Sequence, residues 1–470
     1  MKKRILAFAI FSVCLFVCGC TLNTTINGDA YTDFSSNISS QNNINSFFDE
    51  PISQIVESSS KTSSVYTNQS SKQSDSSLAD STSSVNTKTN SFKSSSNKSS
   101  KKEASISSNS AAKLSTIKVT NSNKSSFKTV GRCDTGSSKG LALAWGGSSI
   151  EFSLICQGEI SLSFSFENSI EPVYIRVELD NKPIHQRLEV SYNSTITIDT
   201  APSIEHHNIK IIRLSDCEAS PLVLESILTY GSLADTPPLN SSIYIEAIGS
   251  NNFCGRGLLL KNSQNTYTES EINDSSFADT TLTYPYLASN LLKADCYLLA
   301  RKISGFVATN VLQTQTINNK VQRICDPSFT LTQLYTRINI HNQKEYTPQR
   351  KPDILIIDAG ELDSNLQLLN RIYLDGRIGI SPNKAAYLTA DFLNSLKASN
   401  PKLKIVWCYG MTSANKDYIS FIHNVIEIID NNSNFVYTLC LPKANNTNFP
   451  TADEHNNAAK LLYKKLKSIV

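Results

Sequence analysis

The chain has 470 residues, 40 % of them hydrophobic, and its 44 basic and 41 acidic residues leave a formal net charge of +3. This balance does not favour a nucleic-acid-binding protein, which needs a concentrated basic face. Residues 51–100 hold twenty serines and two aromatic residues, which is too little apolar surface to offset the entropy of ordering this stretch. The chain from Phe127 onward is long enough for two compact units, so a single small domain is excluded.

The first residues predict a targeting segment. Lys2, Lys3 and Arg4 precede an apolar run over residues 5–17, which is too short to span a bilayer as a permanent helix. The run ends in Val17-Cys18-Gly19-Cys20, which resembles a bacterial lipobox. We therefore expect a lipoprotein signal peptide over residues 1–19; a plain secreted protein cleaved nearby is the alternative.

Lipid on Cys20 would hold the mature protein at the outer, extracytoplasmic face of a bacterial membrane, because several buried acyl chains act together. The Ser/Asn/Lys-rich residues 20–126 are then a disordered tether. Eight cysteines follow Cys20, none in a Cys-x-x-Cys pair, which disfavours a zinc ribbon or a redox motif. They are interpreted as core thiols, although an extracytoplasmic setting permits one or two disulfides.

Residues 127–236 show short apolar runs separated by turn residues. Asp180-Asn181-Lys182-Pro183 is a turn signal between two of them, and Asp235-Thr236-Pro237-Pro238 ends the pattern. Seven strands at this spacing predict a β-sandwich domain. The expected strands are 141–145, 150–156, 160–166, 173–179, 196–200, 209–214 and 222–230.

In residues 237–470, apolar runs alternate with helical periods, which predicts an α/β domain with a parallel sheet and helices on both faces. Ligands bind beyond the carboxyl ends of such strands, so the loops after Ile248, Ala300, Asp358, Tyr409 and Leu441 are the places to search for a site. The expected strands are 243–248, 296–300, 354–358, 405–409 and 435–441, and the expected helices are 284–293, 384–399, 418–431 and 453–469.

Several short blocks resemble the family-two carbohydrate esterases, in which a jelly-roll-like β domain precedes an SGNH (GDSL-type) hydrolase domain. The resemblance covers residues 131–470. It implies a five-stranded parallel sheet and a carbohydrate acetyl esterase ancestry. The blocks that carry it are Gly131-Arg132, residues 141–150, 177–181, 207–213 and 226–231, then 245–249 and Cys254-Gly255-Arg256-Gly257.

Carried over residue by residue, the family's catalytic groups are replaced in this chain. The nucleophilic serine falls on Asn251 and the side-chain oxyanion donor on Leu362. The general base falls on Phe449, with Asn446 at the position of its aspartate. Neither asparagine nor phenylalanine can perform these roles, whereas Gly305 retains a backbone oxyanion donor.

Three residues are left as fallback catalytic candidates: Ser250 as a shifted nucleophile, His455 as a base, and Asp363 as an assisting acid. Each of the first two has a structural alternative, since Ser250 can cap the following helix and Asp453-Glu454-His455 can cap and charge the last one.

Three functions follow from this pattern. The first is a surface-anchored pseudo-esterase that binds a polysaccharide or an acetylated sugar without turnover. The second is an active SGNH-type O-deacetylase with a rearranged site, and the third is an envelope lipoprotein that docks another protein. The sequence suggests no cofactor, no metal and no nucleic acid as a ligand. The binding residues expected for the first function are Asn251, Asn252, Trp407, Tyr409 and Phe449.

Overall fold

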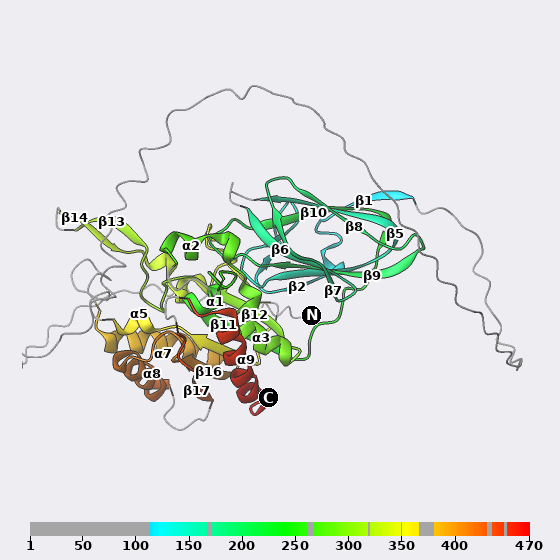
Figure 1. Ribbon diagram of the computed structural model, residues 1–470. Helices are drawn as coiled ribbons and strands as arrows, with labels where there is room; N and C mark the ends of the chain where they lie inside the picture. The colour runs from blue at the N-terminus through cyan, green and yellow to red at the C-terminus, as the bar shows by residue number, and fades with distance from the viewer. Residues whose placement is uncertain are drawn as a thin grey trace, which may run out of the picture. The chain divides into compact units, whose positions relative to one another are not determined.

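The computed structural model describes most of the chain from residue 113 onward (Figure 1). The described residues belong to one compact unit. The expected signal peptide, Cys20, Asn446 and the tether as far as residue 112 lie outside the described residues. The described ranges are 113–166, 172–261, 267–317, 320–348, 350–365, 380–429, 435–445 and 449–470.

The first part of the described chain is an antiparallel β domain. Its strands surround one apolar core, to which buried side chains such as Phe152, Leu162 and Ile211 contribute. The main path of the sheet runs β3-β4-β10-β5-β9-β6-β7, while β1 pairs with β10 and both β2 and β8 pair with β5. The jelly-roll order of this domain stays a prediction. Its strands are β1 Leu114–Lys118, β2 Phe127–Val130, β3 Cys133–Asp134, β4 Leu141–Leu143, β5 Ser149–Phe166, β6 Val173–Leu179, β7 Lys182–Val190, β8 Thr195–Asp199, β9 Glu205–Arg213 and β10 Leu222–Leu233.

Two expectations about this domain require correction. The runs 150–156 and 160–166 are one strand, β5, because Gly158 has a φ of 68° that accommodates a change of register opposite Thr229 and Tyr230. Strand β1 lies within residues 20–126, which were assigned to the tether. It is a mostly exposed edge strand held by pairing to β10, so its polar composition resembles that of the tether. The turn expected at Asp180-Asn181 is confirmed, and both residues have positive φ.

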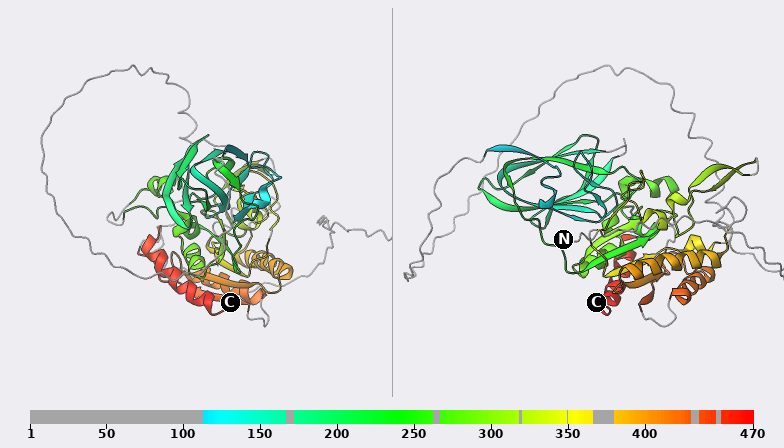
Figure 2. Two further views of the ribbon diagram at one scale, coloured as in Figure 1. Left: turned by 90° about the vertical axis from the view of Figure 1, so that its right-hand side faces the viewer. Right: turned by 180° about the vertical axis from the view of Figure 1, so that it is seen from behind.

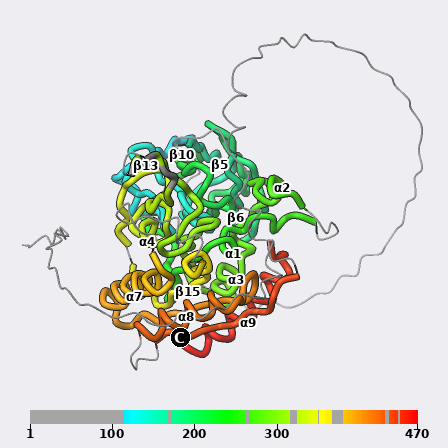
Figure 3. Tube along the Cα trace, turned by 90° about the vertical axis from the view of Figure 1, so that its left-hand side faces the viewer, coloured from blue at the N-terminus to red at the C-terminus, as the bar shows by residue number. Residues whose placement is uncertain are grey.

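The second part contains the expected five-stranded parallel sheet, in the order β12-β11-β15-β16-β17. Successive residues of β15 point to opposite faces, so Leu355 and Ile357 join one core while Ile354 and Ile356 join the other. Helices α7 and α8 pack on the first face and α3 and α9 on the second, and Figure 3 shows α7 and α3 on opposite sides of β15. The elements are β11 Tyr244–Gly249, β12 Asp295–Ala300, β15 Ile354–Asp358, β16 Lys404–Tyr409, β17 Val436–Cys440, α3 Tyr284–Leu291, α7 Pro382–Ser399, α8 Lys416–Ile429 and α9 Ala452–Lys467.

Short elements complete the second part. The hairpin β13–β14, absent from the expected pattern, projects away from the rest (Figure 1). No helix in the described ranges is long and apolar enough to cross a membrane. The short elements of the described chain are η3 Lys124–Ser126, α1 Asn251–Cys254, α2 Glu269–Asn273, η4 Ser275–Phe277, η5 Thr280–Leu282, β13 Leu312–Ile317, β14 Lys320–Cys325, η6 Pro327–Phe329, α4 Leu331–Leu334 and α5 Glu361–Ser364.

All eight cysteines that follow Cys20 lie in the described ranges, and none of them is in a disulfide there. Seven are buried, as expected for core thiols, but Cys440 is exposed. The reason is its place on β17, a strand at the edge of the parallel sheet whose residues are only partly covered.

A buried arginine joins the two parts, which lie beside each other in both views of Figure 2. Arg132 follows β2 and is fully buried, with its guanidinium 3.1 Å from the carboxylate of Glu246 on β11. It donates hydrogen bonds to the carbonyls of Tyr335 (2.6 Å) and Arg337 (3.0 Å), and it lies over the rings of Tyr335 and Tyr346. The indole of Trp145 adds a hydrogen bond to the carbonyl of Ile338.

Candidate functional site

A small cavity of about 60 Å³ lies at the carboxyl ends of the parallel strands, where the fold places ligands. Four of the five expected loops, those after Ile248, Ala300, Asp358 and Tyr409, contribute to its wall. The loop after Leu441 contributes none of the described lining residues. The lining residues are Ser250, Asn251, Asn252, Ile303, Ser304, Asp358, Ala359, Gly360, Glu361, Leu362, Thr412 and Tyr418.

Ser250 and Asn251 follow the end of β11 and face the loop after β12. The amide of Ser304 donates a hydrogen bond to Ser250 Oγ at 3.3 Å, and the amide of Ile303 donates to Asn251 Oδ1 at 2.8 Å. Ile303 has a φ of 48°, a conformation that β-branched residues rarely adopt. Ser250 occupies the N-cap position of α1, but its side chain accepts no capping hydrogen bond, so the hydroxyl contacts the neighbouring loop instead.

Asp358, which the sequence analysis did not single out as a site residue, lies at the centre of a buried hydrogen-bond network. Its Oδ2 accepts from Asn252 Nδ2 and from the hydroxyl of Tyr284, each at 2.8 Å. Asn252 Nδ2 also donates to Thr412 Oγ1 at 3.1 Å. Burial raises the pKa of Asp358 to about 6, although the hydrogen bonds from Asn252 and Tyr284 favour the ionised form. The available signal was a carboxylate at the end of an apolar strand, Ile354-Leu355-Ile356-Ile357-Asp358.

Gly305 does not present an amide to the cavity, contrary to the expectation of a retained oxyanion donor. Its N–H donates to the carbonyl of Ala308 at 2.7 Å, within its own loop. The amide that faces Ser250 is that of Ser304, the preceding residue. The loop turns at this point, so the resemblance located the loop correctly but not the amide that faces the site.

Asp363 is fully buried and acts as an anchor for the loop after β12. Its carboxylate accepts three backbone hydrogen bonds, from Phe306 (2.6 Å), Val307 (2.8 Å) and Ala308 (2.9 Å). A Cβ at Gly305 would clash with this carboxylate, which is why the loop needs glycine there. Burial raises the pKa of Asp363 to about 6 despite the three amides. The carboxylate does not line the cavity and so has no route to assist Ser250.

His455 is a structural residue of helix α9. It is 1 % exposed, and its Nδ1 accepts a hydrogen bond from the amide of Tyr284 at 3.1 Å. Burial lowers its pKa to about 3, so the imidazole is neutral at ordinary pH. The helix begins with a capping box between Thr451 and Glu454, so the expected capping role belongs to Glu454 rather than to His455.

No histidine lines the cavity. The chain has six histidines, all in the described ranges: His185, His206, His207, His341, His423 and His455. Leu362, at the position of the family's side-chain oxyanion donor, lines the wall with an aliphatic side chain. Ser250 is therefore not accompanied by an imidazole base.

The three aromatic residues expected to bind a glycan lie outside the cavity lining. Trp407 is fully buried, and its Nε1 donates to the carbonyl of Ala359 at 3.2 Å, so neither ring face is open to a ligand. Phe449 is 9 % exposed and packs edge-to-face on Tyr267, with ring centroids 5.5 Å apart. Tyr409 is half-buried against the core beneath α7 and α8.

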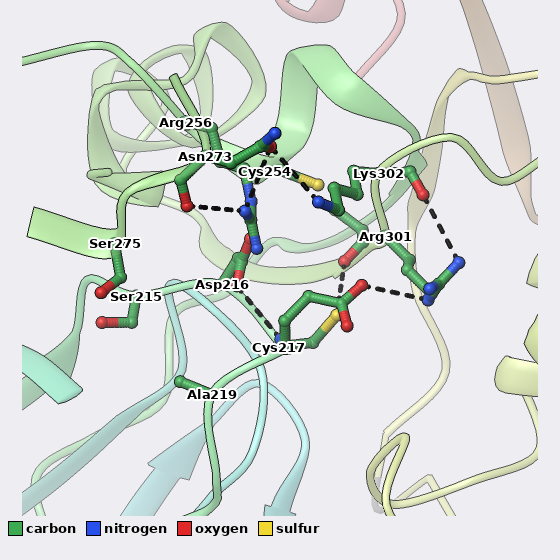
Figure 4. A network of polar contacts seen from close by, with 12 residues as sticks. Ser215, Asp216, Cys217, Ala219, Cys254, Arg256, Asn273, Ser275, Arg301 and Lys302 are labelled. Carbon is green, nitrogen blue, oxygen red and sulfur yellow. Dashed lines mark hydrogen bonds and ion pairs between the residues drawn. The ribbon is translucent and has the colours of Figure 1, made fainter. Parts of the chain in front are cut away.

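Polar contacts from the β domain hold the cavity loops in place (Figure 4). Asp216, between β9 and β10, pairs with Arg256 just after α1. Glu218 forms an ion pair with Arg301 at 3.2 Å, and Arg301 donates to the hydroxyl of Ser304 at 2.9 Å. These contacts connect the β domain to the residue whose amide faces Ser250.

Carbohydrate esterases are among the solved structures with similar architecture. A family-two carbohydrate esterase from Cellvibrio japonicus matches 76 % of this chain and 98 % of its own length, with a TM-score of 0.59 and 17 % identity. The acetyl xylan esterase Est2A from the rumen bacterium Butyrivibrio proteoclasticus matches 76 % and 98 %, with a TM-score of 0.59 and 18 % identity. A family-two esterase from Clostridium thermocellum in complex with cellohexaose matches 73 % and 98 %, with a TM-score of 0.57 and 14 % identity.

This chain has the fold of the family-two carbohydrate esterases. At these identities the likeness shows the fold alone, and the activity of the esterases does not transfer with it. No protein-family model and no curated protein matches the sequence.

Proposed function

We propose that the folded head is a pseudo-esterase that binds a polysaccharide without turning it over. The observation that carries the proposal is the cavity itself, where Ser250 has no histidine beside it. An acyl transfer by serine needs a base to take its proton. The cavity nevertheless keeps its place at the strand ends, and its wall offers amide, hydroxyl and carboxylate groups that can hydrogen-bond a sugar.

A rearranged O-deacetylase is the second candidate. It is favoured by one observation, the hydroxyl of Ser250 at the cavity wall with the Ser304 amide 3.3 Å away. In this reading Ser250 attacks and the Ser304 amide contributes to an oxyanion hole. The candidate still requires a base, and neither His455 nor Asp363 lines the cavity.

The binding proposal is tested by affinity electrophoresis of the protein in gels that contain soluble xylan, glucomannan or a cellulose derivative. We expect retardation in at least one gel. Glu361→Trp, at an exposed lining position, should abolish it by covering the mouth of the cavity. Glu427→Trp, an exposed position of α8 outside the lining, is the matched control. The proposal would be refuted if the protein had the same mobility in every polysaccharide gel as in a gel without polysaccharide.

We also propose that the head is tethered through lipid on Cys20 to the outer face of a bacterial membrane. The support is the apolar run and lipobox-like end of residues 1–20. Cys20→Ser should move the protein from the membrane fraction to the soluble fraction. Retention of the variant in the membrane would contradict lipid anchoring at this residue.

A further inference from the structure

The cavity beside Ser250 has acidic walls, and this bears on what it can hold. Two of its lining residues, Asp358 and Glu361, are carboxylic acids, and none is lysine, arginine or histidine. The neighbouring cations are engaged elsewhere: Lys302 contacts Asn273 at 3.3 Å and Arg301 pairs with Glu218. An oxyanion would be repelled here, whereas a cation or a hydrogen-bond donor would be attracted.

A second observation points to a donor. Asn252 is 6 % exposed and lines the cavity, yet its Oδ1 is buried without a hydrogen-bond partner. The orientation of this amide is fixed, because Nδ2 donates to both Asp358 and Thr412. A buried acceptor without a partner costs stability that a donating ligand would restore.

The size of the cavity limits what enters. At about 60 Å³ the cavity is small. One substituent of a sugar ring fits into this space. A protonated amino group suits it best, because it supplies donors for Asn252 Oδ1 together with a positive charge for Asp358, which is mostly ionised at pH 7.

We propose that the cavity receives the protonated amino group of an amino sugar, so that the head selects glycans with free glucosamine units over neutral or N-acetylated ones. This inference rests on the proposed glycan-binding function. It specifies the substrate class by one substituent, while the rest of the glycan remains outside the cavity.

The test is a calorimetric titration at neutral pH of the full-length chain, solubilised in detergent, with three hexasaccharides. These are the glucosamine hexamer, the N-acetylglucosamine hexamer and cellohexaose. We expect the glucosamine hexamer to bind at least ten-fold more tightly than the other two. Asp358→Asn should reduce that preference to within two-fold by weakening the binding of the glucosamine hexamer.

Two further variants keep the result interpretable. Glu361→Gln alters an exposed side chain at the mouth, so it should weaken glucosamine binding without affecting folding. Asp391→Asn removes a similar charge from an exposed position of α7 outside the lining and should leave binding unchanged.

Equal affinity for all three hexasaccharides would overturn the inference and leave the glycan-binding proposal standing. Binding of none of them would refute both. A lysine hexapeptide that binds as tightly as the glucosamine hexamer, with the same dependence on Asp358, would overturn the assignment to an amino sugar.

Discussion

Tyr284 connects two buried titratable residues, one at the end of β15 and one on α9. Its hydroxyl donates to Asp358 at the cavity, and its backbone amide donates to His455 on α9. Both partners must accept these hydrogen bonds, so the arrangement needs His455 with an unprotonated Nδ1. Protonation of His455 at Nδ1 would therefore break its hydrogen bond with the Tyr284 amide and disturb the residue whose hydroxyl holds Asp358.

This arrangement predicts an acid-sensitive stability. The pKa of His455 is lowered from 6.5 to about 3 by burial, so between these values the unfolded chain binds a proton that the folded chain does not. Stability is therefore lost as the pH falls below about 6.5. Relative to His455→Gln, which keeps an acceptor but does not titrate, the wild type should lose about 1.4 kcal/mol per pH unit.

Urea unfolding at several pH values between 4.5 and 7 checks this prediction. His423→Gln changes an exposed histidine of α8 and should follow the wild-type pH dependence. Parallel curves for the wild type and His455→Gln would show that His455 is not held neutral by its burial.

The candidate site could be predicted from the sequence only in part. The resemblance placed Ser250, Asn251 and Leu362 at one cavity, where the structure finds them. It could not show that the Gly305 amide turns toward Ala308, because loop direction depends on contacts made by a distant carboxylate, Asp363. Nor could it show that Trp407 is completely buried, because an apolar strand has the same composition whether its last residues are covered or exposed.

Helices and strands of the α/β domain were predictable because their apolar spacing is regular. The predicted range 354–358 is β15, and the predicted helix 384–399 lies within α7. Elements stabilised mainly by pairing were missed. Strand β7 has a largely exposed pattern and depends on its hairpin with β6, and β1 depends on β10. The pairing of β1 with β10, far along the chain, leaves no local signal in the sequence. Strand β7 follows the turn at Asp180-Asn181 directly, and it was missed because its exposed pattern lacks an alternation of apolar and polar residues.

The start of α9 supplies a prediction at the level of one element. Thr451 accepts from the amide of Glu454, and Glu454 returns a hydrogen bond to the amide of Thr451. Thr451→Ala should lower the free energy of unfolding by about 1 kcal/mol, because it removes a helix cap. Thermal unfolding measures the effect.

Thr268→Ala removes the same kind of capping box from α2, an exposed five-residue helix without buried side chains, and serves as the control. Its effect should be smaller, because local fraying of α2 exposes no core. Equal losses for the two variants would mean that the α9 cap is not coupled to the packing of that helix.

At the scale of the whole molecule, the buried pair Arg132–Glu246 makes the β domain and the α/β domain depend on each other. Glu246 lies on β11 itself, where Tyr335 also donates to it at 2.8 Å. Ion pairs of this kind add little over an apolar substitute, but losing one partner leaves a buried charge uncompensated. The pair therefore determines how the β domain packs on the α/β domain more than it adds to the free energy of unfolding.

Glu246→Leu should accordingly destabilise the protein by about 3–5 kcal/mol, whereas the double variant Arg132→Met with Glu246→Leu should recover much of that loss. Calorimetry should show one cooperative transition for the wild type. Additive losses in the double variant, or two separate transitions in the wild type, would contradict the coupling.

We propose above that the cavity holds a glycan but lacks the base for ester hydrolysis. Acetate release from acetylated xylan and acetylated glucomannan, measured for the wild type and for Ser250→Ala, tests this directly. We expect no release above background from either protein. Release by the wild type that disappears with Ser250→Ala would instead establish a working esterase.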